Sequence, residues 1–249
     1  MSQTWPEDLA QLKKIARITG LFYLIIIVCG MFAEGAVRAE LIVLGNPEST
    51  SQNIHNNQGL FRAGILADLV MVVADVVVAL GFFVLLRAVS ASLSLLAAFF
   101  RLVQASALGL NLIFLWMALQ VTIGADLTPT LPGQEASVGT ATPAANTSYL
   151  LLNAHATGYK LALIFFAGSL IVQSYLIYRS ELFPSWLAIL ILLAAFGYIT
   201  DTVGTLGMSN YAEHSDIFEG IVVVAALAGE IPLCLWLLIK GVRSRHLAA

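Results

Sequence analysis

Residues 61–87 read FRAGILADLVMVVADVVVALGFFVLLR, and almost every residue between Arg62 and Arg87 is apolar. A helix that crosses a bilayer needs about 20 consecutive apolar residues, so this stretch predicts a membrane span. Two aspartates, Asp68 and Asp75, lie inside it. An aspartate at the centre of a membrane helix costs about 2.5–3.5 kcal/mol on an insertion scale, so both carboxylates need a structural or functional reason to be there.

The composition of the chain agrees with a membrane protein. Of its 249 residues, 59% are hydrophobic and 11% are charged, whereas a soluble domain carries roughly 25% charged residues. The lipid bilayer is therefore the first predicted partner. A net charge of −3 without a basic run argues against nucleic acid. Cys29 and Cys234 lie in apolar runs and predict buried thiols, so we expect no metal site and no cofactor.

Five further stretches resemble residues 61–87 in length and apolar content. Together they predict an all-α protein, a polytopic bundle of six transmembrane helices. We expect one transmembrane domain over 15–240, with a cytoplasmic segment at 1–14 and a cytoplasmic tail at 241–249. The predicted spans are about 15–35, 62–86, 92–123, 150–178, 184–207 and 216–240.

The distribution of lysine and arginine predicts the orientation of the bundle. With the N-terminus inside, eight of these residues lie on the cytoplasmic side and only Arg38 and Arg62 lie outside. This asymmetry predicts cytoplasmic termini in a bacterial inner membrane. Residues 36–61 then form a polar outer loop and residues 124–148 a flexible one. Tyr198 is among the aromatic residues expected at a membrane interface. The eight inner residues are Lys13, Lys14, Arg17, Arg87, Arg179, Lys240, Arg243 and Arg245.

Five runs of the sequence carry a family resemblance. They are ARITGLFYLIIIVCGMFAE at 16–34, FRAGILADLVMVVADVVVAL at 61–80, AAFFRLVQASALGLNL at 97–112, YLIYRSELFPSWLAILILLAAFGYITD at 175–201 and GEIPLCLWLLIKGV at 229–242. Through these runs the chain resembles an uncharacterised bacterial multi-pass membrane family, domain of unknown function 4386. The resemblance implies the six-span architecture but brings neither an activity nor site residues. The loop 124–148 departs from the family pattern, because it is longer and less varied.

Six ionisable side chains lie well inside the predicted spans. If they faced lipid, they would together cost on the order of 15–20 kcal/mol, which exceeds the ~5–15 kcal/mol stability of a typical domain. They must therefore face the interior of the bundle or water, and be paired, hydrogen-bonded or neutralised. The six residues are Asp68, Asp75, Arg101, Lys160, Asp201 and Glu230.

Asp75 and Arg101 are predicted to form an ion pair. The short connection after Arg87 makes their two spans antiparallel neighbours, and both residues lie at a similar distance from it along the chain. Gln104 and Asn111 share the helix face of Arg101. Two interpretations of the pair stay open, because it either fixes the register of two helices or takes part in function.

A second polar layer is expected toward the outer face. Asp68, His155 and Asp201 lie at comparable depth in three spans, and Lys160 lies one turn deeper. Three interpretations stay open: a binding site for a divalent cation, a polar vestibule, and simple neutralisation of Asp68 or Asp201 by Lys160.

The last span contains the sequence Gly229-Glu230-Ile231-Pro232. Proline removes a backbone donor and clashes with a carbonyl group in the preceding turn, so a kink beside Glu230 is predicted, with Gly229 adding local freedom. Broken helices of this kind line substrate and ion sites in transporters. The alternative is a kink that serves only packing.

Counting charges within the spans leaves two acids in excess, four against the two bases Arg101 and Lys160. A buried carboxyl without a partner takes up a proton or binds a cation. This excess favours a proton- or cation-linked carrier or binder of a small ligand. A non-catalytic partner subunit, in a homo-oligomer or with another membrane protein, is the first alternative. An intramembrane enzyme acting on a lipid or peptide is the second, and the sequence offers no catalytic residues for it.

Overall fold

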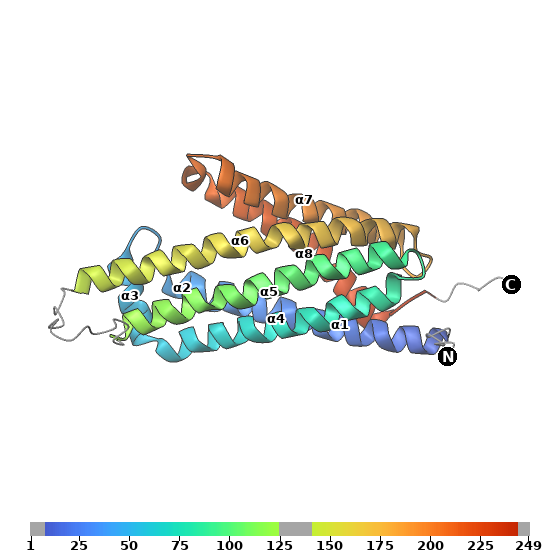
Figure 1. Ribbon diagram of the computed structural model, residues 1–249, viewed down its shortest axis with the longest axis horizontal. Coiled ribbons are helices and arrows are strands. Elements are labelled where there is room, and N and C mark those ends of the chain that lie inside the picture. The colour runs from blue at the N-terminus through green and yellow to red at the C-terminus, as the bar shows by residue number, and fades with distance from the viewer. Residues whose placement is uncertain (1–7, 125–140, 244–249) are drawn as a thin grey trace. The chain divides into compact units, whose positions relative to one another are not determined.

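The computed structural model describes residues 8–124 and 141–243, and the regular structure within these ranges is helical. Six helices are long and apolar enough to cross a membrane, as the sequence predicts (Figure 1). An apolar run in lipid has no water to satisfy its backbone, and a helix satisfies it internally. The six candidate spans are Leu9–Leu41, Gln58–Leu86, Ala91–Thr122, Pro143–Arg179, Ser185–Gly207 and Ser215–Ile239.

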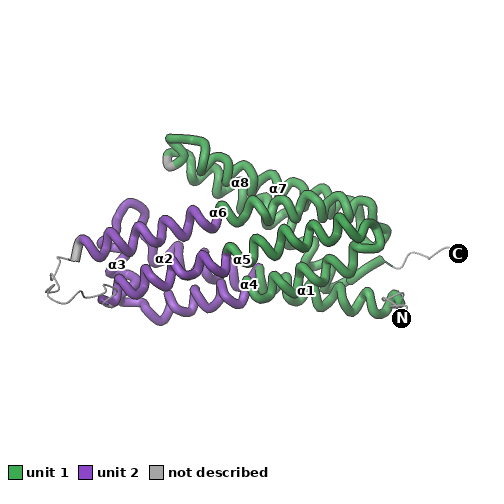
Figure 2. Tube along the Cα trace, viewed as in Figure 1, with its two compact units in different colours: residues 1–26, 72–107, 160–249 green, residues 27–71, 108–159 purple. Residues whose placement is uncertain are grey.

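The chain divides into two compact units (Figure 2). Unit 1 comprises residues 1–26, 72–107 and 160–249, and unit 2 comprises 27–71 and 108–159. Helices α1 (Leu9–Met31), α4 (Gln58–Leu86), α5 (Ala91–Thr122) and α6 (Ala141–Arg179) contribute residues to both units. The prediction of a single domain over 15–240 stays a prediction.

Unit 1 includes α7 (Ser185–Gly207) and α8 (Ser215–Ile239), which pack closely through small residues. A Cβ atom added at Gly229 would lie 2.8 Å from the carbonyl oxygen of Leu190 and 2.9 Å from the Cβ of Ala194. Small residues let membrane helices approach each other in this way. Gly229 therefore serves the contact with α7. Because α8 runs through Pro232 as one helix, the predicted kink stays a prediction.

In unit 2, much of the predicted loop over 36–61 is helical, so this prediction is wrong. The first span continues beyond 35 through a π-helix, η1 (Phe32–Arg38), and a short helix, α2 (Ala39–Leu41). A further helix, α3 (Pro47–Asn56), follows, because the side chain of Asn46 caps its first turn by accepting from the Ser49 N–H at 3.0 Å and proline occupies its start. The prediction of a loop rested on the polar composition and did not take the cap at Asn46 and the proline at position 47 into account.

The fourth span also begins earlier than predicted, since α6 starts at Ala141. The last part of the predicted loop 124–148 is therefore helical. The prediction of flexibility falls on residues 125–140, which lie outside the described residues.

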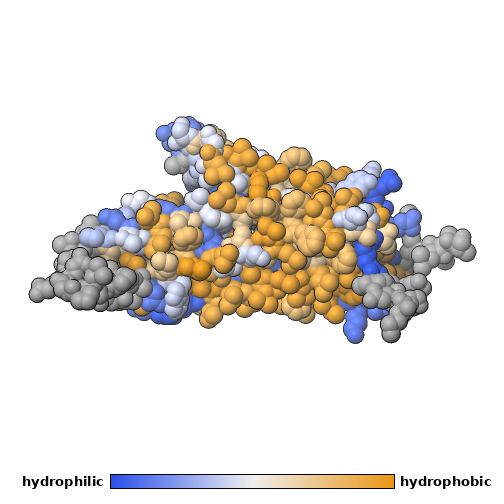
Figure 3. All heavy atoms as spheres, in the orientation of Figure 1, coloured by the Kyte–Doolittle hydropathy of each residue, from blue (hydrophilic) through white to orange (hydrophobic). Residues whose placement is uncertain are grey.

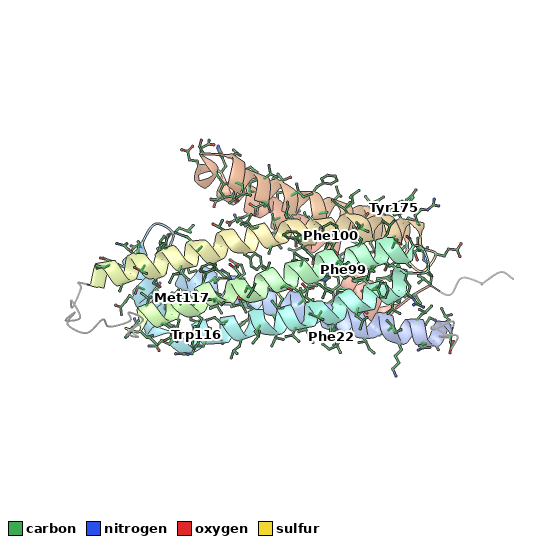
Figure 4. All side chains as sticks on the ribbon, viewed as in Figure 1. Phe22, Phe99, Phe100, Trp116, Met117 and Tyr175 are labelled. Carbon is green, nitrogen blue, oxygen red and sulfur yellow. The ribbon has the colours of Figure 1, made fainter. Side chains whose placement is uncertain are left out.

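Large apolar side chains are exposed on helices of both units, and apolar residues predominate in the middle of the face drawn in Figure 3. Phe99 and Tyr175 in unit 1 and Trp116 and Met117 in unit 2 are large exposed residues of this kind (Figure 4). Soluble proteins rarely expose extended apolar patches. We therefore describe the chain as a multi-pass α-helical membrane protein, and its buried polar side chains define the candidate site.

Candidate functional site

Asp75 on α4 and Arg101 on α5 form the predicted ion pair. Arg101 Nε donates to Asp75 Oδ1 at 2.6 Å, and both side chains are almost completely buried. Gln104, one turn along α5, is also buried and interacts with the Asp75 carboxylate. The prediction is confirmed because the connection between α4 and α5 is short, so equal spacing from it places two residues at equal depth.

The Arg101 guanidinium group lies against two aromatic rings. Its Cζ is 5.2 Å from the ring centre of Tyr23 on α1 and 5.0 Å from that of Phe166 on α6. Aromatic faces attract a cation through their quadrupole, and more strongly where water is excluded. Within the described part of the chain, Nη1 and Nη2 of Arg101 have no hydrogen-bond partner. The rings and Asp75 therefore stabilise this buried charge.

Glu230 on α8 is held by two tyrosines. Tyr23 donates to Oε2 at 3.0 Å, and Tyr198 on α7 donates to Oε1. All three side chains are buried. Among residues 8–124 and 141–243, no lysine, arginine or histidine forms an ion pair with Glu230. Glu230 is thus a buried carboxyl group that has hydrogen bonds but no direct ion pair among these residues, while the charge of Arg101 acts on it at longer range.

These residues form one connected group in unit 1, which we call the central cluster. The rings of Phe166 and Tyr198 stack edge to face with their centres 5.3 Å apart, so the two sides of the cluster touch. Each of the six spanning helices supplies one side chain, and the cluster therefore joins all six. Its members are Tyr23, Asp75, Arg101, Phe166, Tyr198 and Glu230.

Tyr198 was wrongly predicted to be an interfacial residue. It is buried and donates to Glu230 because α7 turns this face toward α8. Sequence reasoning also missed Tyr23, since a tyrosine in an apolar span looks like ordinary core. The signal that points to both is an unpaired buried carboxyl, which needs donors from neighbouring helices.

Asp68 pairs with Arg38 in unit 2. Arg38 Nη1 donates to Asp68 Oδ2 at 2.6 Å and Nη2 to Oδ1 at 3.4 Å, while Nε donates to Glu34 at 2.8 Å. Arg38 and Asp68 are both buried. The sequence predicts Arg38 in an outer loop, but η1 continues the first span and brings Arg38 to the depth of Asp68. The interpretation that Lys160 neutralises Asp68 is therefore wrong.

His155 and Asn111 lie in unit 2 and are both buried. The Asn111 amide donates to the backbone carbonyl of His155 at 2.8 Å and so ties α5 to α6. The His155 ring is 6.1 Å from the ring of Tyr159. The described residues contain no group of three or more His, Cys, Asp or Glu side chains that could hold a metal ion. Asp68, His155 and Asp201 thus do not meet there as a divalent-cation site.

Asp201 pairs with Lys160 in unit 1. Lys160 Nζ lies 3.4 Å from Asp201 Oδ1 and donates to the Tyr211 hydroxyl at 2.6 Å, while Tyr211 donates to Asp201. Glu219 lies 3.8 Å from the same ammonium group. The interpretation that Lys160 neutralises Asp201 is confirmed.

The structure therefore changes the count of buried charges. Three acids have basic partners, in the pairs Asp68–Arg38, Asp75–Arg101 and Asp201–Lys160. The predicted excess of two acids falls to one, because Arg38 joins the buried bases. In the part of the chain that the structure describes, Glu230 is the remaining buried carboxyl without an ion pair.

This arrangement defines the class as a multi-pass helical membrane protein with ion-paired interior charges. The chain belongs to the family described as Domain of unknown function (DUF4386), whose model matches residues 18–241. It is also similar to an uncharacterized protein of Archaeoglobus fulgidus, with 29% identity over 177 residues, or 71% of this chain and 83% of that protein. No solved structure matches the chain. The family resemblance seen in the sequence is confirmed.

Proposed function

We propose that this protein is a proton- or cation-linked carrier or binder of a small ligand, with Glu230 as the proton-exchanging group. The observation that supports this most is the bonding of Glu230, which lies buried between two tyrosine hydroxyls while the other three buried acids are ion-paired. Ionisable residues inside membrane spans commonly mark ion pathways and proton relays.

The hydrogen bonds of Glu230 suit repeated proton exchange. A tyrosine hydroxyl both donates and accepts, so Tyr23 and Tyr198 can bond to a carboxylate and to a protonated carboxyl. Glu230 can therefore release and regain a proton without losing its partners. Arrival of a cation or a cationic ligand would favour the ionised form, and because Tyr23 and Tyr198 come from α1 and α7, the change would reach three helices.

The orientation of the bundle is part of the proposal. We place both termini in the cytoplasm and the protein in the inner membrane of a bacterial cell. Arg38 is buried in an ion pair within the first span and no longer counts as a residue of the outer side. Of the two lysine and arginine residues counted outside, Arg62 then remains, so the excess of basic residues on the cytoplasmic side is larger.

Cysteine labelling tests this orientation. Gln52 on α3 and Glu181 after α6 are both exposed, so each can be replaced by cysteine in a chain whose Cys29 and Cys234 are alanine. A thiol reagent that cannot cross the membrane should label Gln52→Cys in intact cells and Glu181→Cys only after lysis. The reverse pattern would contradict the proposed topology.

A non-catalytic partner subunit is the second candidate function. It is favoured by the small size of the cavity beside Arg101, which is about 10 Å³ and has roughly the room of one water molecule. A carrier with this central cluster must open to admit a ligand, whereas a structural subunit need not. On the subunit proposal, Glu230→Gln would leave all properties of the protein nearly unchanged.

Chemical labelling distinguishes the two candidates. Dicyclohexylcarbodiimide enters membranes and reacts with carboxyl groups in their protonated form. We expect it to modify Glu230 and to spare Asp68 and Asp75, because an ion-paired carboxylate holds no proton. Mass spectrometry of peptides should show that labelling of Glu230 falls as the pH is raised. Glu230→Gln serves as the control and should lose this label.

Two results would contradict the carrier proposal. One is the absence of label on Glu230 at every pH, which would mean that the carboxyl never holds a proton within reach of the reagent. The other is equal labelling of Glu230 and Asp75, which would mean that the ion pair does not set them apart.

A further inference from the structure

A small cavity lies beside Arg101 within unit 1 and has a volume of about 10 Å³. Its wall comes from α4, α5 and α6 and is largely apolar. Four polar residues also line it: Ser94, Arg101, Ser169 and Gln173.

Two of these residues carry buried polar atoms without a partner. Nη1 and Nη2 of Arg101 and Oε1 of Gln173 make no hydrogen bond to any described residue. Both side chains are only 1% exposed. Buried polar atoms in native proteins are almost always hydrogen-bonded, and those that look unpaired commonly bind an internal water.

The unpaired atoms are complementary to each other. The nitrogen atoms of Arg101 can only donate, and Gln173 Oε1 can only accept, so a molecule that bridges them must do both. Ser94 and Ser169 donate to the backbone carbonyls of Phe83 and Ala97, at 3.0 and 2.8 Å, and their oxygens can still accept. The lining thus includes both free donors, on Arg101, and free acceptors, on Gln173, Ser94 and Ser169.

Size and charge select the molecule that fits. A cavity of about 10–15 Å³ is the smallest that holds one water, which needs two to four polar partners. A cation would be repelled by Arg101. An anion would face Gln173 Oε1, an acceptor, and would lie near the Asp75 carboxylate.

We infer that one water molecule is bound in this cavity, accepting a hydrogen bond from Arg101 Nη and donating one to Gln173 Oε1. This water anchors the edge of the guanidinium group that Asp75 leaves free. It also places an exchangeable proton beside the central cluster. The inference stands on the cavity and its unpaired atoms, independently of any role of Glu230.

The variant Gln173→Met tests the inference through the sign of a stability change. Methionine has nearly the length and volume of glutamine but no carbonyl oxygen. If water bridges the two side chains, the variant loses an acceptor and Tm falls by about 2–4 °C. If the cavity is dry, the variant removes an unpaired polar atom and Tm stays the same or rises. That second result would overturn the inference.

A matched control and a direct observation complete the experiment. Thr205 Oγ1 is also buried without a partner, but Thr205 does not line the cavity. Thr205→Val should therefore not lower Tm, and an equal fall in both variants would overturn the inference. An experimental map fine enough to show ordered waters should contain one peak between Arg101 and Gln173, and a clear map without it would also refute the bound water.

Discussion

Replacing Arg101 with glutamine is expected to destabilise the protein by about 3–5 kcal/mol, because the change leaves Asp75 as a buried carboxylate without its counter-ion. Asp75→Asn should have an effect of similar size, since it leaves a guanidinium group that is only 1% exposed. The double variant should lose less than the sum of the two, because neither charge is then left alone. Thermal unfolding in one detergent gives all three values.

The expected coupling between these two substitutions is about 0.5–3 kcal/mol. Arg17→Gln is the matched control, because Arg17 is an exposed arginine on α1, and a surface change of this kind is usually within about 0.5 kcal/mol. If the losses of the two single variants add up in the double variant, the ion pair contributes nothing specific.

Asp75 and Asp68 answer the question raised by the two aspartates in residues 61–87. Each carboxylate forms an ion pair with one arginine: Asp75 with Arg101 and Asp68 with Arg38. They lie in different compact units and share no partner in the described part of the chain. The two carboxylates therefore fix neighbouring helices to each other, and neither is the unpaired acid that the charge count predicts.

The Asp75–Arg101 pair could be predicted because only local geometry was needed. A short connection makes α4 and α5 neighbours, and counting residues from it gives the depth of each side chain. The Arg38–Asp68 pair could not be predicted in the same way. It depends on the π-helix η1 continuing the first span, whereas the charged residues Glu34, Arg38 and Glu40 look in the sequence like the start of a loop.

The hydrogen-bond partners of Glu230 could not be predicted from the sequence, for a different reason. Its excess charge was visible, but Tyr23 lies 207 positions away along the chain. Apolar residues surround each of these positions, so periodicity does not reveal which face of a helix meets which neighbour. The six spans could be predicted from composition, whereas the order and rotation of the helices around Glu230 required the structure.

The second large effect concerns the proton on Glu230. A protonated carboxyl group has a C=O stretching band that a carboxylate lacks, so infrared difference spectra between two pH values report the proton directly. Near neutral pH, where exposed Asp and Glu side chains stay ionised, we expect one such band in the wild-type protein, because a single buried acid lacks a direct basic partner among the described residues. In Glu230→Gln the band should disappear completely, while in Arg17→Gln, which changes an exposed residue, it should persist.

Tyr198→Phe provides a more sensitive variant, because it removes one hydrogen bond and keeps the carboxyl group. The C=O band should then shift in frequency without being lost, since the frequency depends on the hydrogen bonds of the group. Thr200→Val is a suitable control on α7, because among the described residues the Thr200 hydroxyl donates to the backbone carbonyl of Phe196 in its own helix and to no other group.

The infrared titration of wild-type protein against Glu230→Gln is the most direct test of Glu230 as the proton-exchanging group. The proposal predicts a pH-dependent C=O band that belongs entirely to Glu230. A band of equal size near neutral pH in Glu230→Gln, or no such band near neutral pH in the wild-type protein, would contradict it and favour a non-catalytic partner subunit.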